Sequence, residues 1–273
     1  MTAPAPTTSP HQRRRALTDC RTMVRRRLTH MRRYPSLTLM LIGQPIVFLL
    51  LFVYVFGATM GAGLAGPGGG RAEYLTFITP AILLMTIASV ALSTALAVAT
   101  DMTEGIVDRF RTMAIARVSV LTGHVVGALI QTAVALVVVL AVALLLGFRS
   151  AADAVGWLGV VGLLALVTLA LTWFTVALGL AARSVETASN TPLFLVLLPF
   201  LGSGFVPTGS MPAGLRWFAE YQPFTPIIDT LRGLLTDAPD VTGSAVAAVA
   251  WSVVIAAGSY LWARHLFATR GAR

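Results

Sequence analysis

Charged side chains that could bind a partner are concentrated in one short stretch, Thr100 to Gly123. It holds three acids and three arginines between two long uncharged runs, namely Asp101, Glu104, Asp108, Arg109, Arg111 and Arg117. If the stretch is helical, the three acids fall within a narrow arc beside an apolar stripe. This arrangement fits a docking surface for another protein, and it fits equally well a solvated helix with a capped start.

The capping interpretation is local and accounts for two of the acids. Asp101 is placed to cap the helix, and Glu104 follows three residues later in a capping-box arrangement. It leaves Asp108 unexplained, because Asp108 lies one turn after Glu104 and repels it unless Arg111 compensates. The residues alone therefore leave both interpretations open.

The chain contains no lysine, because all 20 basic residues are arginine. The phosphate-binding loop of many ATPases and a Schiff-base site both require lysine. The single cysteine, Cys20, excludes an intrachain disulfide, and the four histidines lack metal-ligand spacing. We therefore expect no metal site and expect any nucleotide hydrolysis to come from another polypeptide.

Composition identifies an integral membrane protein. Apolar residues make up 56% of the 273 residues, charged residues make up 11%, and the mean hydropathy is +0.81. Soluble domains carry roughly 25% charged residues. A helix that crosses a bilayer needs about 20 mostly apolar residues, and six such windows occur, at 37–60, 77–100, 118–147, 155–182, 187–205 and 241–263.

The sequence thus predicts an all-α membrane protein with four regions. These are a disordered basic tail at 1–15, an amphipathic helix at 16–36, a six-span domain at 37–263 and a cytoplasmic tail at 264–273. In the second region apolar residues recur at helical spacing among arginines, which predicts a helix on anionic lipid headgroups. A nucleic-acid-binding arm is the alternative, and we expect no nucleic acid as a partner.

Arginine counts predict the orientation. With the N-terminus inside, 16 arginines lie on the cytoplasmic side, and four lie outside, namely Arg71, Arg149, Arg216 and Arg232. Positively charged residues favour the cytoplasmic side, so we expect a multi-pass protein of the plasma membrane with both termini in the cytoplasm. The charged stretch after the second span would then face the cytoplasm.

The outer loop from Pro207 to Asp240 is unusually apolar. Pro212 can start one short helix and Pro226 a second. Such a helix pair would dip into the outer leaflet as a lid over an exit path, or it would form an interfacial aromatic belt. Another alternative is a membrane enzyme or scaffold with a lipid-related site in this loop, built on the acids Glu220, Asp229, Asp237 and Asp240. These acids lack metal-like spacing, and we expect them on solvated helix ends.

No Asp, Glu, Lys or Arg lies inside the six windows. Ion-coupled carriers usually need such residues, and many channels line their pore with charged rings. The absence of charge therefore disfavours both an ion-coupled carrier and a channel. Gln44, Gln131 and Asn190 are substrate-path candidates because a primary amide is costly to face toward lipid, although most such residues are packing contacts between helices. His124 has no carboxylate at i±4, so we interpret it as structural or interfacial. No nucleophile with its base is present in the spans, and we expect no enzyme activity.

Together these residues resemble a known family. The pattern Glu104-Gly105-x-x-Asp108-Arg109-x-Arg111, between the second and third of six spans, resembles the coupling region of type-2 ABC transporter permeases, the daunorubicin-permease branch of drug exporters in particular. Phe205-x-Pro207, Met211-Pro212, the turn from Pro223 to Pro226 and Arg232 resemble the loop between spans five and six of that family. The resemblance covers nearly the whole chain. A proline that commonly follows the coupling helix is missing here, where the residues read Met113-Ala114-Ile115.

The resemblance implies an exporter of a lipophilic compound, with two permease subunits, identical or close paralogues, and two separate ATPase subunits that bind ATP and Mg²⁺. The stretch between spans two and three would insert into the ATPase. We assign this contact to Asp101, Glu104, Gly105, Asp108, Arg109 and Arg111. The resemblance further implies an outer gate formed by Pro207, Met211, Pro212, Pro223 and Arg232, and Phe205 joins the substrate-path candidates.

Overall fold

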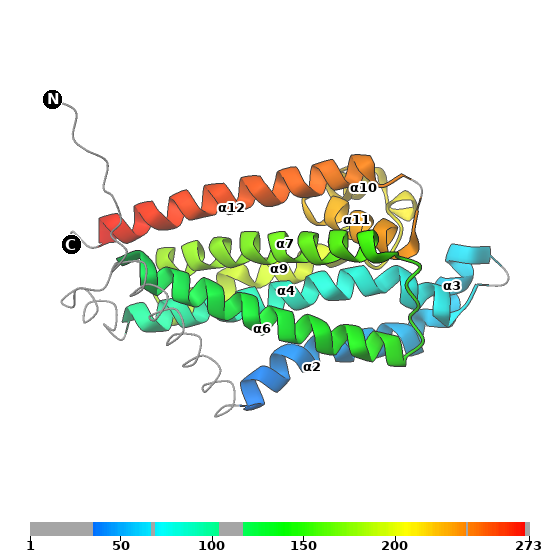
Figure 1. Ribbon diagram of the computed structural model, residues 1–273, viewed down its shortest axis with the longest axis horizontal. Coiled ribbons are helices and arrows are strands. Elements are labelled where there is room, and N and C mark those ends of the chain that lie inside the picture. Colours follow the sequence, from blue (N-terminus) through cyan, green and yellow to red (C-terminus); the bar gives the residue numbers. More distant parts are fainter. Residues whose placement is uncertain (1–34, 67–68, 104–116, 239, 271–273) are drawn as a thin grey trace.

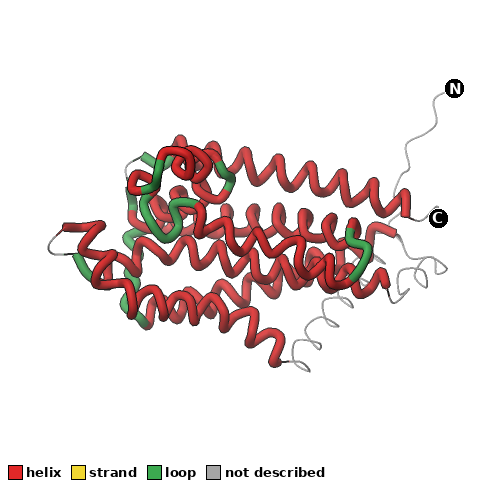
Figure 2. The backbone as a smooth tube through the Cα atoms, turned by 180° about the vertical axis from the view of Figure 1, so that it is seen from behind, coloured by secondary structure: helices red, strands yellow, loops and turns green. Residues whose placement is uncertain are grey.

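The computed structural model describes residues 35–66, 69–103, 117–238 and 240–270, and all regular elements in these ranges are helical (Figures 1 and 2). The predicted tail at 1–15, nearly all of the predicted helix at 16–36, and residues 104–116, which we call the elbow, lie outside the described residues. In chain order the elements are α2 (Pro35–Leu51), the π-helix η1 (Phe52–Phe56), α3 (Gly57–Ala65), α4 (Arg71–Thr103), α6 (Arg117–Leu145), α7 (Ala154–Ala181), α8 (Val185–Asn190), η3 (Thr191–Leu193), α9 (Phe194–Leu197), η4 (Leu198–Leu201), η5 (Thr208–Ser210), α10 (Ala213–Tyr221), α11 (Phe224–Thr236) and α12 (Thr242–Arg270).

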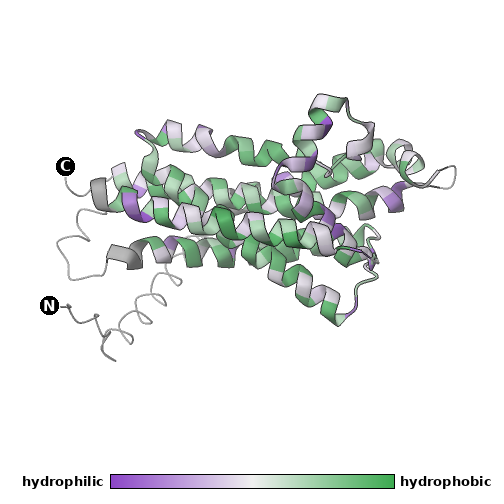
Figure 3. Ribbon diagram, turned by 90° about the horizontal axis from the view of Figure 1, so that it is seen from above, coloured by the Kyte–Doolittle hydropathy of each residue, from purple (hydrophilic) through white to green (hydrophobic). Residues whose placement is uncertain are grey.

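Five helical segments of the described residues are long and apolar enough to cross a membrane. They cover Leu39–Leu64, Arg71–Thr103, Leu121–Leu145, Ala154–Ala181 and Thr242–Phe267. Each contains most of one window predicted from the sequence, so the class of fold and five of the windows are confirmed. Figure 3 shows hydrophobic residues along the middle of the bundle and the most hydrophilic ones toward its ends.

The window predicted at 187–205 differs from the others. Here the chain forms a shorter apolar helical segment, Val185–Leu201, in which α8 and α9 alternate with the 3-10 turns η3 and η4. Pro192 and Pro199 lie at the start of these two turns. Proline has no N–H to donate and crowds the preceding turn, so an uninterrupted α-helix is unfavourable here.

Helix α4 is the centre of the bundle. In its most apolar window 78% of the residues are buried, and it packs against α2, α3, α6, α7, α8 and α11. Its buried hydroxyl groups bond to carbonyls one turn back, as Thr79 does with Leu75, Thr86 with Ile82, and Ser89 with Met85. These internal bonds let α4 carry polar side chains in a dry interior without unpaired donors.

The buried residues form two hydrophobic cores at opposite ends. The larger core joins α2, η1, α4, α6, α7, α9, α11 and α12, and the smaller one joins α4, α6, α7 and α12. We call the end with α10 and α11 the lid end, and the end where α4 stops and α6 begins the elbow end (Figure 1). The chain enters α8 and leaves α12 at the elbow end as well.

The two lid helices begin at different points relative to their prolines. Pro212 directly precedes α10, as predicted. By contrast α11 starts at Phe224, directly after Pro223, so Pro226 lies in its first turn. Proline is tolerated there because the first N–H groups of a helix have no partner within the helix. At the C-terminus, α12 continues as far as Arg270, into the segment 264–273 predicted as a tail.

Candidate functional site

At the elbow end, the structure describes one of the six residues assigned to ATPase contact. Asp101 lies in the last turn of α4, which ends at Thr103. The prediction that Asp101 caps a following helix is therefore wrong, because its backbone still belongs to α4. Glu104, Gly105, Asp108, Arg109 and Arg111 lie outside the described residues.

Asp101 is paired with a residue on the next described helix. Its Oδ2 atom lies 3.0 Å from Nε2 of His124 in α6, and the Asp101 and His124 side chains are 27% and 14% exposed, respectively. His124 thus has a carboxylate neighbour, and the search at i±4 missed it because the partner lies on another helix. The pair joins the two helices that flank residues 104–116.

The substrate-path candidates are dispersed over the bundle. Gln44 in α2 and Asn190 in α8 are exposed on the surface of the chain, whereas Gln131 in α6 and Phe205 after η4 are buried. The four residues lie on different elements. Among them, Phe205 belongs to a cluster of aromatic rings.

This aromatic cluster consists of Phe48, Phe52, Phe56, Phe200 and Phe205. The Phe52 ring is central, with centroids 4.7 Å from Phe205 and 5.5 Å from Phe56. Phe200 and Phe205 stack nearly parallel at 4.2 Å. The π-helix η1 begins at Phe52 and ends at Phe56, and short π-helical turns within α-helices are frequent at functional sites. Helical spacing of the first three rings was visible in the sequence, but their meeting with Phe200 and Phe205 was not.

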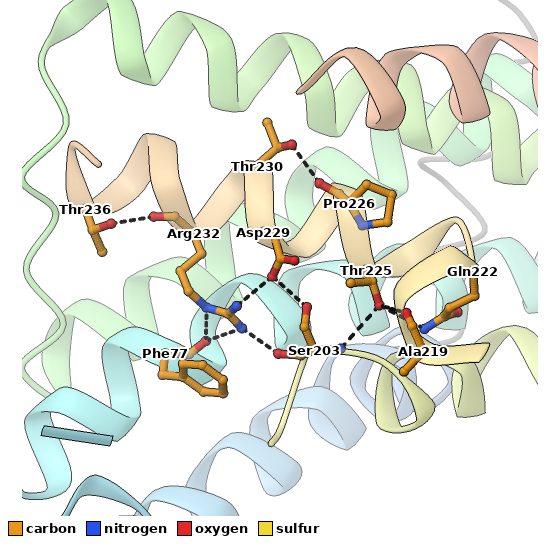
Figure 4. Close-up of polar contacts among 10 residues, drawn as sticks. All are labelled: Phe77, Ser203, Ala219, Gln222, Thr225, Pro226, Asp229, Thr230, Arg232 and Thr236. Atoms are coloured by element: carbon orange, nitrogen blue, oxygen red, sulfur yellow. Dashed lines mark hydrogen bonds and ion pairs between the residues drawn. The ribbon is translucent and has the colours of Figure 1, made fainter. Parts of the chain in front are cut away.

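At the lid end, Arg232 binds three separate segments of the chain (Figure 4). Its Nη1 donates to Oδ1 of Asp229 at 2.8 Å, its Nη2 donates to the Ser203 carbonyl at 2.7 Å, and its Nε and Nη2 both donate to the Phe77 carbonyl of α4 at 3.3 Å. The guanidinium carbon also lies 3.8 Å from the centre of the Phe77 ring. We call the four residues Arg232, Asp229, Ser203 and Phe77 the Arg232 latch.

Within the latch, the Asp229 carboxylate accepts hydrogen bonds from both of its neighbours. Ser203 Oγ donates to Asp229 Oδ1 at 2.6 Å, so the carboxylate receives two donors. Burial lowers the pKa of Arg232, and the nearby Asp229 carboxylate opposes that shift, so the guanidinium keeps its charge near neutral pH. Pro80 follows Phe77 by three residues in α4 and donates no N–H. In an α-helix that missing donor would pair with the Thr76 carbonyl, so the bonds from Arg232 to the Phe77 carbonyl are additional to the helix's own bonding.

The placement of Asp229 differs from the prediction. The sequence interpretation put the loop acids on solvated helix ends, yet Asp229 lies inside α11 and is bound by Arg232 and Ser203. The i, i+3 spacing of these two charges was available in the sequence. No group of three His, Cys, Asp or Glu side chains that could hold a metal occurs among the described residues.

The other outer-gate candidates lie around the lid helices. Pro207 and Met211 flank the short turn η5, and Pro212 and Pro223 are the residues that precede α10 and α11. Arg216 of α10 donates to the carbonyls of Thr208, Gly209 and Met211, which fixes this turn to the helix. Of the predicted gate, Arg232 is the residue that connects the lid to α4.

Comparison with known proteins agrees with this architecture. The model of the ABC-2 type transporter family matches residues 18–236. The chain is also similar to the daunorubicin resistance ABC transporter permease protein DrrB1 of Streptomyces coeruleorubidus, with 31% identity over 226 residues that cover 78% of this chain and 76% of the relative. The family match includes the elbow, the lid and all but the last of the five long spans, and the chain therefore belongs to the ABC-2 type transporter family.

Proposed function

We propose that this chain is the membrane subunit of an exporter that moves a lipophilic compound out of the cell, powered by a separate ATP-binding-cassette ATPase. The observation that carries the proposal is the family match over residues 18–236, which includes both the elbow and the lid. The relative is named as a permease of daunorubicin resistance. Because the chain has no lysine, the Walker-type loop that binds ATP must lie on another polypeptide.

The elbow is the proposed contact with the ATPase. Residues 104–116 connect α4 to α6, so a displacement of this segment acts directly on two spans. Glu104, Gly105, Asp108, Arg109 and Arg111 would meet the ATPase, which would hold ATP and Mg²⁺. The ATPase can drive α4 and α6 only if it binds two conformations of the membrane subunit with different affinity.

The lid end is the proposed exit. Pro207, Met211, Pro212, Pro223 and Arg232 would form the outer gate, and the Arg232 latch would hold it shut on α4. Phe205 connects the gate to the interior, because its ring stacks on Phe200 and its carbonyl accepts a hydrogen bond from Tyr74 of α4 at 3.3 Å. A lipophilic cargo would pass near these rings before the lid opens.

The distribution of arginines supports the proposed orientation in the plasma membrane. Arg71, Arg149, Arg216 and Arg232 lie at the lid end, while Arg183 and Arg264 lie toward the elbow end. With the rule that arginine prefers the cytoplasmic side, the elbow end would face the cytoplasm, as would both termini. We further propose that Val185–Leu201 is the sixth crossing.

Exposed amides support a second copy of the permease as a partner. Gln44 and Asn190 lie on the surface of apolar helices, where contact with lipid would leave their polar groups unbonded. A second copy that covers these residues would satisfy them. Gln131, which is buried, would remain a path candidate within each copy.

The test is reconstitution of the permease with its ATPase in proteoliposomes, with daunorubicin and a fluorescent lipid analogue as cargo. ATP-dependent movement of either compound is the expected result.

A Glu104→Arg, Asp108→Arg variant should lose co-purification of the ATPase, because two repulsive or misplaced charges enter the contact. Glu220→Arg, an exposed acid of α10 at the lid end, is the matched control and should keep the complex.

Two results would contradict the proposal. Full co-purification and full cargo-stimulated ATP hydrolysis in the double variant would remove the elbow as the coupling site. Failure of any ATP-dependent transport by the intact complex, across a panel of lipophilic drugs and lipids, would count against export.

A further inference from the structure

The pair of Asp101 and His124 stands where the chain leaves α4 and re-enters α6. Asp101 lies two residues before the end of α4, and His124 lies seven residues after the start of α6. The Nε2–H group of His124 can donate to Oδ2 of Asp101 whether the imidazole is neutral or protonated. At 3.0 Å, the pair links the two helices across the base of the elbow.

The position of Asp101 is unfavourable for α4 taken alone. A helix C-terminus carries partial negative charge from its unpaired carbonyls, and an acid in the last turn is repelled by it. The side chain is also mostly shielded, with 27% exposed. A donor on another helix offsets both costs, so His124 of α6 stabilises the acid at this position.

The helices around the pair share the smaller hydrophobic core. Val98 of α4, Leu121 and Val125 of α6, Leu180 of α7 and Ala263 of α12 belong to the smaller core, and Met102 packs against it. Gly179 of α7 approaches α4 so closely that a Cβ there would lie 2.6 Å from the Ala95 carbonyl oxygen. Close-packed helices transmit displacement because their interior has no free space.

We propose that Asp101 and His124 are positioning residues that fix the exit of α4 to the entry of α6, so that a push on the elbow moves α4, α6, α7 and α12 as one body. This inference rests on the proposed coupling to an ATPase. It also changes the role of Asp101, from a residue that touches the ATPase to one that holds the helices behind the contact. Without the pair, the elbow would pull on each helix separately and ATP hydrolysis would be poorly converted into transport.

The experiment compares transport per ATP hydrolysed in the reconstituted complex. Asp101→Ala and His124→Ala should each lower this ratio at least about fivefold, the lower end of coupling between sites, while co-purification of the ATPase stays unchanged. His124→Gln keeps an N–H donor on a side chain of similar reach and should retain most of the ratio. The double variant Asp101→His, His124→Asp exchanges the partners and should recover more than either single variant.

Glu220→Ala is the matched control, because it removes an exposed acid at the other end of the molecule. An unchanged ratio in both alanine variants would overturn the inference, as would an exchanged pair that is no better than the single variants. Loss of the ATPase from the Asp101→Ala complex would place Asp101 in the contact surface and also overturn it. Normal coupling in the Glu104→Arg, Asp108→Arg variant would instead refute the proposed elbow contact, so the two failures are distinguishable.

Discussion

The lid end and the elbow end are held together by different kinds of contact. At the lid end, Arg232 bonds to Phe77 and Tyr74 bonds to Phe205, each across more than 100 residues of sequence. At the elbow end, a small core of aliphatic side chains is supplemented by Asp101 and His124. The lid end is therefore joined by polar contacts between segments far apart in sequence, whereas in the described part of the elbow end an aliphatic core and the Asp101–His124 pair join neighbouring helices.

This difference suggests a division of labour. Redundant attachments stabilise one conformation of the lid, so opening it requires several contacts to break together. At the elbow end, the Asp101–His124 pair joins the two helices that flank the elbow, so a change in this pair can alter how motion passes through the bundle. We expect substitutions at the lid end to act mainly on stability and those at the elbow end mainly on coupling.

The largest loss of stability is expected from Phe205→Ala at the lid end. Phe205 is 4% exposed and its ring contacts Phe52 and Phe200. Removing the ring leaves a cavity and should lower the free energy of unfolding by about 3 kcal/mol. This is the low end for buried aromatics, because moving an apolar side chain from lipid into the protein gains less free energy than moving it from water. Thermal unfolding in lipid nanodiscs measures the loss. Phe194→Ala, which removes a ring that is 43% exposed in α9, should change stability much less. Equal losses in the two variants would show that the aromatic cluster stabilises the protein no more than an exposed ring does.

Arg232→Ala should cost about 2 to 3 kcal/mol, the range for hydrogen bonds to charged groups whose partners are left behind. The change leaves Asp229 without its cation and removes two donors from the Phe77 carbonyl. Arg232→Lys keeps the charge without the planar fork and should recover only a fraction of the loss. Arg216→Ala, at an exposed arginine that bonds to the adjacent turn, serves as the control. A lysine variant as stable as the parent would show that charge, and not the fork, holds the lid.

Gly179→Ala should cost about 2 kcal/mol at the elbow end, because its Cβ would overlap the Ala95 carbonyl and force α7 away from α4. Transport per ATP should fall more than stability does. Gly162→Ala in the same helix is the matched control, since nothing lies within 4 Å of its added Cβ, and better helix propensity makes it neutral or slightly stabilising. If both variants transport normally, close packing of α4 and α7 is not required for coupling.

The smallest effect is expected at the N-cap of α7. Asp153 accepts a hydrogen bond from the Gly156 N–H at 2.7 Å. Asp153→Ala should cost about 1 kcal/mol, and Asp153→Asn, which is also a good cap, should cost almost nothing. The same unfolding measurement applies. A large loss in the asparagine variant would point to a role for the charge beyond capping.

Much of the fold was predictable because the bilayer imposes a simple rule. A long uncharged run has to form a helix that satisfies its own backbone, so five windows could be located without knowledge of their packing. The window at 187–205 was harder to interpret, because the effect of Pro192 and Pro199 depends on whether neighbouring helices accommodate the turns they induce. The π-helix at Phe52–Phe56 left no signal in the sequence.

The candidate sites were less predictable because they depend on contacts between helices. A search within one helix found no carboxylate for His124, although Asp101 lies beside it on another helix. The elbow residues 104–116 lie outside the described residues, so their assignment remains a prediction from the sequence pattern. At the lid, Arg232 was named from the family resemblance and its role in a gate stays a prediction, while its contacts with Ser203 and Phe77 became visible only when the helices were brought together.

The burial of α4 has a consequence for how the bundle is approached from the bilayer. Photoreactive probes dissolved among the acyl chains should label α12 heavily and leave the middle of α4 nearly untouched, because the helices packed against α4 screen it on almost every side. A lipophilic compound that enters the bundle from the bilayer would likewise have to displace the outer helices before it contacts α4.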